Sequence, residues 1–289
     1  MTSPVRTAPS APSVPHPLTW LYAPGDRPRV VAKALASGAD IVIVDLEDAV
    51  APDRKDYARA ATADLLREPG HPVPVHVRVN ALDTPAAAKD LAALAALPGL
   101  AGLRLPKVTS AEQIIHLAQT TPPAAPGTTP LHALLETALG IERAHAIASA
   151  HPSLHGISLG EADLRSDLGV RGDAGLDWSR SRVVVAARAA GLSPPSQSIH
   201  PDIRDLEGLA ASCAHGRTLG FLGRAAIHPR QLPVIERAYL PTEAELEQAE
   251  TIIKAATTEQ GAQALQDGTF IDAAVVAAAH RTLSLARRR

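Results

Sequence analysis

A series of short apolar segments, each followed by a charged residue, is the feature of this sequence that most constrains its fold. The segments are rich in Val, Ile and Leu without polar alternation, which is typical of strands buried on both faces of a parallel sheet. Because parallel strands present their carboxyl ends at one edge, we expect the charged residues to meet there. They are Asp45 after residues 41–44, Arg78 after residues 73–77, Glu136 after residues 131–135, and Asp163 four residues beyond residues 156–159.

Helical patterns separate these segments, so strands and helices alternate along the chain from residue 18. We count eight predicted strands up to Ile227, the last two at residues 195–199 and 225–227. Eight βα units close most naturally into a TIM (β/α)8 barrel, which makes this α/β fold the prediction. The alternative is an open doubly wound sheet. Against it, residues 24–26 (Pro-Gly-Asp) are not the glycine-rich turn that follows the first strand of a dinucleotide-binding sheet.

Composition and periodicity predict three regions. Residues 1–17 are rich in Pro, Ser, Thr and Ala and are expected to be disordered. Residues 18–240 form the predicted barrel, which would carry the catalytic site. Residues 241–289 form a predicted helical extension, with helices at 242–258 and 270–286. Thr242, followed by glutamates in the first turn, is a strong helix start.

Composition also excludes several classes of partner and site. A formal net charge of −2 gives no support for nucleic-acid binding, which usually requires a basic face. No run approaches the ~18 apolar residues of a membrane span, and no apolar core of a signal peptide is present. Cys213 is the only cysteine, which excludes an intrachain disulfide and a cysteine-based metal cluster. We therefore expect a cytoplasmic protein without membrane or nucleic-acid partners.

The acids at the strand ends have two interpretations. Glu136 and Asp163 could bind a hard divalent cation such as Mg²⁺, which often needs only one or two protein carboxylates. Alternatively, each begins the helix that follows it. Asp45, Glu47 and Asp48 place three acids within four residues at another strand end. Some of these acids should point into the mouth of the barrel, and others should start the next helix.

Two basic residues at strand ends also have two interpretations each. The planar guanidinium of Arg78 could bind a carboxylate or an enolate oxygen, or could form a structural ion pair with Asp45 or Glu47. Lys107 could form a Schiff base, as in lysine-dependent aldolases. The other interpretation of Lys107, which we favour, is a charge that faces a phosphate or carboxylate.

Seven segments in a fixed order resemble the citrate lyase β-subunit-like proteins of the HpcH/HpaI aldolase family, over residues 18–285. They are LYAPGDRP (21–28), DLEDAV (45–50), RVN (78–80), LPKV (105–108), ETA (136–138), GEADL (160–164) and AIHP (226–229). The resemblance implies a TIM barrel that forms homotrimers or hexamers. It also implies Mg²⁺-dependent cleavage or formation of a carbon–carbon bond in malyl-, citramalyl- or citryl-CoA-type thioesters, with a 2-oxo acid as the other partner.

The resemblance assigns roles to individual residues. Glu136 and Asp163 match the metal ligands, and Arg78 matches the arginine that contacts the oxo-acid or enolate oxygen. Asp272 is similar to an aspartate that the C-terminal helix of a neighbouring subunit lends to the site for proton transfer. The extension 241–289 would therefore pack on a neighbouring subunit. The acids that match those around the water shell of the metal are Asp45, Glu47 and Asp48.

One departure from the family pattern keeps other functions open. Many members carry Arg-Ser where this sequence has Leu18 and Thr19, so a cationic contact to CoA or to the acyl group is missing. The alternatives are an aldolase that acts on free 2-oxo acids without CoA, a Schiff-base aldolase that uses Lys107, and a non-catalytic subunit of a multi-subunit lyase.

Overall fold

The computed structural model describes residues 16–121, 129–258, 263–264 and 270–286. The segment predicted to be disordered, 1–17, lies outside these ranges except for its last two residues. The chain divides into two compact units, one of residues 17–238 and one of residues 239–289 together with 1–16.

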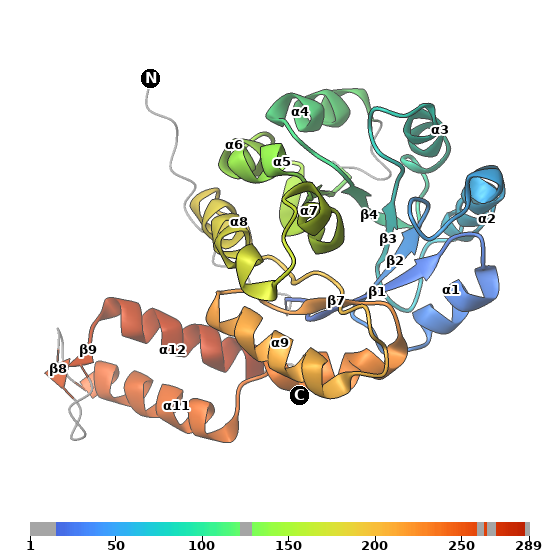
Figure 1. Ribbon diagram of the computed structural model, residues 1–289. Helices are drawn as coiled ribbons and strands as arrows, with labels where there is room; N and C mark the ends of the chain where they lie inside the picture. The colour runs from blue at the N-terminus through green and yellow to red at the C-terminus, as the bar shows by residue number, and fades with distance from the viewer. Residues whose placement is uncertain (1–15, 122–128, 259–262, 265–269, 287–289) are drawn as a thin grey trace. The chain divides into compact units, whose positions relative to one another are not determined.

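A curled parallel sheet forms the centre of the 17–238 unit (Figure 1). Its described strands are β1 (Thr19–Pro24), β2 (Ile41–Asp45), β3 (Val75–Arg78), β4 (Leu100–Leu105), β5 (Leu131–Leu135), β6 (Leu154–Leu159) and β7 (Arg224–Ala226). They pair in the order β6-β5-β4-β3-β2-β1-β7, so neighbours along the chain are neighbours in the sheet up to β6. This order is produced by successive βα units that turn in one direction.

The predicted eight-stranded barrel is corrected to this seven-stranded sheet. The strand expected at residues 195–199 contributes one isolated bridge, in which Gln197 pairs with Arg224. Gln197 donates its N–H to Gly223 and accepts from the N–H of Ala225. Pro195 has no N–H to donate. On the other side, the N–H of Glu161 binds the side-chain Oγ of Ser198, so no backbone ladder to β6 forms there among the described residues.

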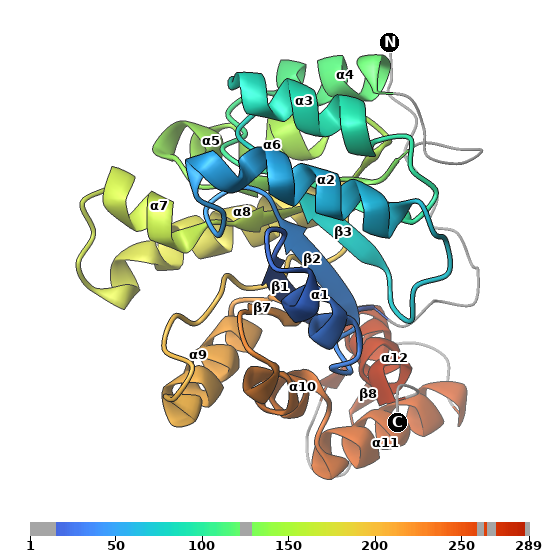
Figure 2. The ribbon, with the colours of Figure 1, turned by 90° about the vertical axis from the view of Figure 1, so that its right-hand side faces the viewer.

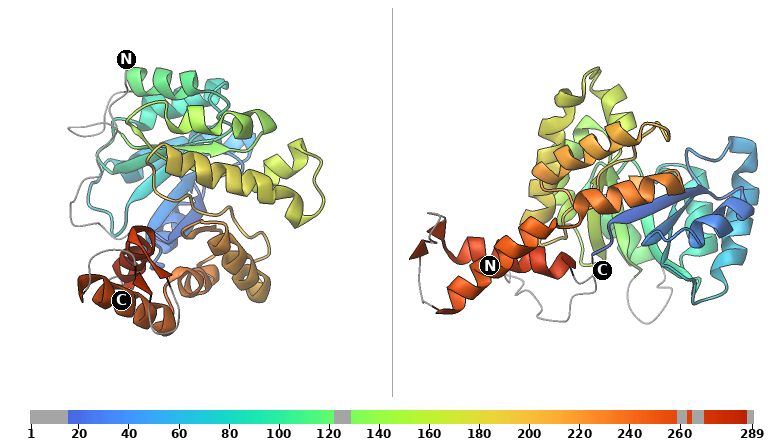
Figure 3. Two further views of the ribbon diagram at one scale, coloured as in Figure 1. Left: turned by 90° about the vertical axis from the view of Figure 1, so that its left-hand side faces the viewer. Right: turned by 90° about the horizontal axis from the view of Figure 1, so that it is seen from below.

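Helices pack around the outside of the curled sheet (Figure 1). They are α1 (Pro28–Leu35), α2 (Lys55–Leu66), α3 (Pro85–Leu94), α4 (Ala111–Thr120), α5 (Ala138–Glu142), α6 (Ala144–Ala148), α7 (Glu161–Asp167), α8 (Asp177–Ala189), α9 (Leu206–Thr218) and α10 (Leu232–Tyr239). Helix α2 packs against α3 (Figure 2), and α8 packs against α6 and β6 on the opposite side (Figure 3). No helix in the described part of the chain is long and apolar enough to cross a membrane.

The two faces of the sheet differ in chemistry because side chains alternate along each strand. The outer face is apolar; Val42, Val77 and Leu103 are fully buried there. The inner face is polar at several positions. The strand register aligns Asp45 with Arg78, Arg78 with Arg104, and Arg104 with His132 across β2 to β5. The curl of the sheet therefore encloses charged and imidazole side chains.

Two short helices follow β5. Helix α5 begins at Ala138, where the Thr137 hydroxyl accepts from the N–H of Gly140, and α6 follows after a break at Arg143. Thr137 is the residue that caps this helix. The carboxylate of Glu136 is therefore free for another role.

The 239–289 unit contains α11 (Glu243–Thr258), α12 (Ala273–Ala286) and a short antiparallel pair, β8 (Gln263–Ala264) and β9 (Phe270–Ile271). Its core includes Ile252, Ile271 and Ala279. Thr242 and Glu245 exchange capping hydrogen bonds at the start of α11, which confirms the predicted helix start. The helix predicted from residue 270 begins instead at Ala273, because Phe270 and Ile271 pair with β8.

Candidate active site at the carboxyl edge of the sheet

A bidentate ion pair joins the ends of β2 and β3. The Arg78 Nε and Nη2 atoms donate to the two carboxylate oxygens of Asp45 at 2.8 and 2.6 Å. The same oxygens accept from the backbone N–H groups of Glu47 and Ala49. Asp45 is 1% exposed and has a partner for each oxygen. Its carboxylate therefore fixes the loop and the arginine, and has no free oxygen for another ligand.

The third guanidinium nitrogen of Arg78 contacts the other two acids of the loop. Nη1 lies 3.0 Å from both the Glu47 and the Asp48 carboxylates. Burial by itself would lower the pKa of Arg78, but the hydrogen bonds and charge of Asp45 raise it above its ordinary value. The structure thus contains the ion pair of Arg78 with Asp45 that was one of the two interpretations of the sequence. It places a permanent positive charge in this acidic loop.

Lys107 connects this loop to the opposite side of the site. Its ammonium lies 2.7 Å from Glu47 and 3.5 Å from Asp163, and its backbone N–H donates to Glu136 at 2.7 Å. The residue has φ of 53°, a left-handed conformation that turns this N–H toward Glu136. Burial would lower the pKa of Lys107, but the hydrogen bond and charge of Glu47 raise it above its ordinary value. The side chain is a stable ammonium.

Glu136 is a buried carboxylate, 3% exposed, directly after β5. A Cβ on Gly160 would lie 2.0 Å from its Oε2 atom, so the carboxylate packs against bare glycine backbone. Burial first, and then the charge of Glu47, raise the pKa of Glu136 to about 7. A carboxyl group with this shift gains from a nearby cation, because the cation offsets the cost of the buried charge.

Asp163 lies in the first turn of α7, with its side chain 45% exposed. Arg180 stabilises the first turn of this helix. Its side chain is 2% exposed and donates to both carboxylate oxygens of Glu161 at 3.0 and 2.6 Å. Asp163 therefore lies within a helix that begins two residues earlier, at Glu161, and does not cap it. It also faces the Lys107 ammonium and raises the pKa of Glu136 by its charge.

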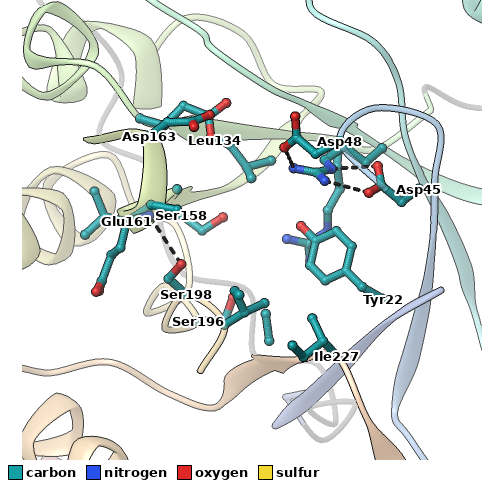
Figure 4. A pocket seen from close by; sticks show the side chains of 18 of the residues that line it. Tyr22, Asp45, Asp48, Leu134, Ser158, Glu161, Asp163, Ser196, Ser198 and Ile227 are labelled. Carbon is teal, nitrogen blue, oxygen red and sulfur yellow. Dashed lines mark hydrogen bonds and ion pairs between the residues drawn. The ribbon is translucent and has the colours of Figure 1, made fainter. Parts of the chain in front are cut away.

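Asp45, Asp48, Arg78, Glu136 and Asp163 line a pocket of about 340 Å³ at the carboxyl edge of the sheet, and Glu47 and Lys107 are not part of its lining. Figure 4 shows Asp45 and Asp48 on one side of it and Asp163 on the other. The wall between them contains Tyr22, Ser158, Ser196 and Ile227. Leu18, where the family pattern has an arginine, is buried at the start of β1 and does not line the pocket. The residues predicted from strand ends are thus gathered at one site.

The sequence reasoning missed Arg104, which lines the pocket from β4 and is 4% exposed. The sequence did contain a signal for Arg104: a charged residue between Leu103 and Leu105 in a buried strand is as unusual as Arg78 at the end of β3. It also missed Gly160. That this position has no room for a side chain becomes evident only when Glu136 is placed beside it.

Asp272 belongs to the 239–289 unit and is exposed. Its Oδ1 atom accepts from the N–H groups of Ala274 and Val275, so the carboxylate caps α12. The preceding residues 267–269 of its predicted motif lie outside the described residues.

The curled parallel sheet and the pocket of charged residues at its carboxyl edge define the class of α/β proteins that place their active sites at this edge. The chain belongs to the HpcH/HpaI aldolase/citrate lyase family, whose model matches residues 18–229.

Similar proteins extend along nearly the whole chain. A citrate lyase subunit beta-like protein of Mycobacterium tuberculosis is 37% identical over 272 residues, which cover 91% of this chain and 93% of that protein. A (3S)-malyl-CoA thioesterase of Cereibacter sphaeroides is 37% identical over 284 residues, with coverage of 94% and 95%. The crystal structure of CitE from M. tuberculosis in complex with magnesium, acetoacetate and coenzyme A has a TM-score of 0.78, 36% identity, and coverage of 94% of this chain and 97% of that chain.

Proposed function

We propose that this protein is a Mg²⁺-dependent carbon–carbon lyase that cleaves or forms a short 3-hydroxyacyl-CoA thioester. The products of cleavage would be a 2-oxo acid and an acyl-CoA. The observation that carries this proposal is the convergence of Glu136 and Asp163 on one pocket beside Arg78. The M. tuberculosis CitE complex with magnesium, acetoacetate and coenzyme A supports it.

The donor set fits Mg²⁺. Among the described residues no three His, Cys, Asp or Glu side chains are grouped to hold a metal ion. Two carboxylates are nevertheless enough for Mg²⁺, which keeps several waters and shares the oxygens of its substrate. The Lys107 ammonium already lies among Glu47, Asp163 and the Glu136 loop, so the site accommodates positive charge. Glu136 and Asp163 would hold the ion, which acts as a Lewis acid on the substrate oxygens.

The other residues of the site would act on the substrate directly or hold its surroundings. Arg78 would stabilise negative charge on the substrate oxygen, with Asp45, Glu47 and Asp48 fixing its guanidinium. Lys107 would face a carboxylate of the substrate. Asp272, lent by a neighbouring subunit of a homotrimer or hexamer, would move the proton at the α-carbon of the thioester. The extension 241–289 would pack on that neighbour.

The geometry at Lys107 opposes the Schiff-base alternative. A lysine nucleophile needs a lowered pKa, whereas the pKa of Lys107 is raised by Glu47. Borohydride reduction in the presence of pyruvate should therefore leave Lys107 unmodified in the mass spectrum. A covalent adduct on Lys107 would contradict this assignment.

A thioesterase is the second candidate, because one similar protein is named a (3S)-malyl-CoA thioesterase. The two reactions differ in products: a lyase releases an oxo acid and an acyl-CoA, and a thioesterase releases a hydroxy acid and free CoA. Incubation with malyl-, citramalyl- and citryl-CoA, followed by chromatography of the products, distinguishes them. Turnover of free hydroxy acids alone would indicate the CoA-independent aldolase, and absence of any turnover would indicate an accessory subunit.

The metal assignment has its own test. Glu136→Ala and Asp163→Ala should each abolish Mg²⁺-dependent turnover, and EDTA should abolish turnover by the unmodified protein. Asp64→Asn, which changes an exposed acid on α2, is the control and should leave turnover unchanged. Full activity in either pocket variant would refute the assignment.

Two further features of the proposed enzyme follow the family pattern. We infer that the segment around Gln197 takes the place of the seventh strand of an eight-unit barrel, since it bridges to β7. A cytoplasmic location stays a prediction.

A further inference from the structure

Arg104 is a buried arginine for which the described chain offers no acidic partner. Its side chain projects from β4 into the curl, is 4% exposed, and its Nε atom has no hydrogen-bond partner. The contact that the structure gives the guanidinium is with the ring of Trp20, 5.9 Å from its centre. A buried charge without a counter-charge costs several kcal/mol. A negatively charged ligand beside Arg104 would offset this cost.

The charged surroundings of Arg104 are uncompensated. Burial lowers the pKa of Arg104; Tyr22 acts in the opposite direction, and the positive charge of Arg78 lowers the pKa further. After burial, the charge of Arg104 is the next cause that lowers the pKa of His76. Its neighbours on the inner face are thus another cation, neutral imidazoles and aromatic rings. This region favours an anion.

Arg104 lines the same pocket as the proposed metal ligands, but deeper along the strands. The register aligns Arg104 with His132, and Glu136 follows four residues later on the same segment. At about 3.3 Å per residue, the Glu136 backbone lies roughly 13 Å beyond that of Arg104. A ligand that contacts both side chains must span the part of this separation that the side chains themselves do not cover. It must carry a negatively charged group at its deep end.

Arg224 gives an internal comparison. It is also 4% exposed, but its Nη1 atom donates to the Ser212 hydroxyl at 2.8 Å and it does not line the pocket. The Nε atom of Arg224, like that of Arg104, has no hydrogen-bond partner, but Arg224 is bonded within the chain through Nη1, whereas Arg104 lines the pocket.

We propose that Arg104 binds the second carboxylate of a dicarboxylic 2-oxo acid, and so selects such acids over those with an uncharged side chain. This inference rests on the proposed function, in which Mg²⁺ held by Glu136 and Asp163 would bind the 2-oxo group and the first carboxylate of the acid. A fork of guanidinium donors matches a carboxylate with two parallel hydrogen bonds. Arg104 would thus be the residue that determines which 2-oxo acid the enzyme accepts.

The test compares oxaloacetate with 2-oxobutyrate, which have the same chain length and differ by a carboxylate in place of a methyl group. Calorimetry in Mg²⁺ measures the Kd of each. The unmodified protein should bind oxaloacetate roughly 10- to 100-fold more tightly, the range expected of a charge-assisted hydrogen bond. Equal affinities would overturn the proposal without any variant.

Variants assign the preference to Arg104. Arg104→Gln should remove the preference for oxaloacetate and leave the Kd of 2-oxobutyrate unchanged, whereas the matched control Arg224→Gln should keep the preference. If Arg104→Gln does not fold, Arg104→Lys should reduce the preference, because an ammonium lacks the planar fork. Retention of the full preference in a folded Arg104 variant would overturn the proposal.

The failure of this inference is distinguishable from failure of the proposed function. Mg²⁺-dependent binding of 2-oxobutyrate with no preference for oxaloacetate would refute the role of Arg104 alone. Binding of both acids that is indifferent to Mg²⁺ and to Glu136→Ala would refute the metal site, and the Arg104 proposal with it.

Discussion

At the scale of single residues, the position of the Glu136 carboxylate depends on a glycine. Gly160 ends β6 at the point where Glu136 leaves β5, and a Cβ there would meet the Oε2 atom at 2.0 Å and the Glu136 Cβ at 2.7 Å. The glycine is therefore required by close approach of two chain segments, and its φ of −99° is available to any residue.

Gly160→Ala should displace Glu136 and weaken Mg²⁺ binding by tenfold or more. The free energy of unfolding should fall by about 1–3 kcal/mol, as in other overpacked sites. Calorimetry with Mg²⁺ and urea unfolding measure the two effects. Gly172→Ala is the matched control, because a Cβ at Gly172 meets no atom within 4 Å. Equal Mg²⁺ affinity in Gly160→Ala and the unmodified protein would show that Glu136 does not depend on Gly160.

Two buried histidines on the inner face determine how the fold responds to acid. His76 and His132 stack with their ring centres 4.8 Å apart, and each lies opposite a glycine, Gly102 and Gly156 respectively. A Cβ on either glycine would lie 3.0 Å from the facing ring. Burial, more than any other cause, lowers the pKa of both imidazoles well below 6.5.

The two buried histidines should make the protein less stable as pH falls below about 6.5, whereas the raised pKa of Glu136 acts in the opposite direction, because the folded chain takes up that proton more readily than the unfolded chain. In the unfolded chain these histidines bind protons near pH 6.5, whereas in the fold they stay neutral to lower pH, so acid favours unfolding. The slope should approach roughly 1.4 kcal/mol per pH unit for each histidine. Urea unfolding between pH 7 and 5 measures it. His132→Gln should reduce the slope, and His116→Gln, at an exposed site, should not; an unchanged slope in His132→Gln would contradict the explanation.

At the scale of elements, α7 carries Asp163 and depends on one buried arginine. Arg180 of α8 binds Glu161 at the first turn of α7, and also Asp173 and Asp177 at 2.9 and 3.0 Å. The helix has only seven residues, and a segment this short is marginal without tertiary contacts, which is why the sequence offered a helix at Asp163 only as one of two interpretations.

Arg180→Gln should lower the free energy of unfolding by about 3–5 kcal/mol, the usual cost of breaking a buried ion pair. It should also weaken Mg²⁺ binding, because α7 then holds Asp163 less firmly. Arg165→Gln removes a more exposed partner of the same Asp173 and should change stability by less than about 1 kcal/mol. Unchanged Mg²⁺ affinity in a folded Arg180→Gln protein would show that Mg²⁺ binding does not depend on Arg180.

At the scale of the whole molecule, the proposed enzyme would need two copies of the chain to complete one site. Glu136 belongs to the 17–238 unit and Asp272 to the 239–289 unit, where it caps α12. Asp272→Asn keeps an oxygen that can cap the helix but cannot take up a proton at neutral pH.

Mixed oligomers of Glu136→Ala and Asp272→Asn chains should therefore regain activity, although each variant alone is inactive. With random mixing, one site in four combines an intact Glu136 with an intact Asp272 of the neighbour, so recovery should approach about a quarter of normal turnover. Native mass spectrometry confirms that mixed oligomers have formed. Mixed oligomers without recovered turnover would contradict the shared site.

The sequence by itself determined the parallel strands, the order of the βα units and the charged residues at the strand ends. These follow from local patterns: uninterrupted β-branched runs, caps such as Thr242, and polar residues where the runs stop. The single bridge at Gln197 and the bounds of the short helix α7 could not be predicted, because each depends on contacts between segments distant in the chain.

Only the tertiary structure decided what each charged residue touches. Arg78 pairs with Asp45 across 33 residues of sequence, and Lys107 is held as an ammonium by Glu47 across 60. The need for glycine at position 160 likewise comes from the approach of Glu136, on another segment. The same holds for Arg104. Its sequence neighbours show a charge in a buried strand, but the absence of an acid beside it in the described part of the chain is a property of the folded sheet.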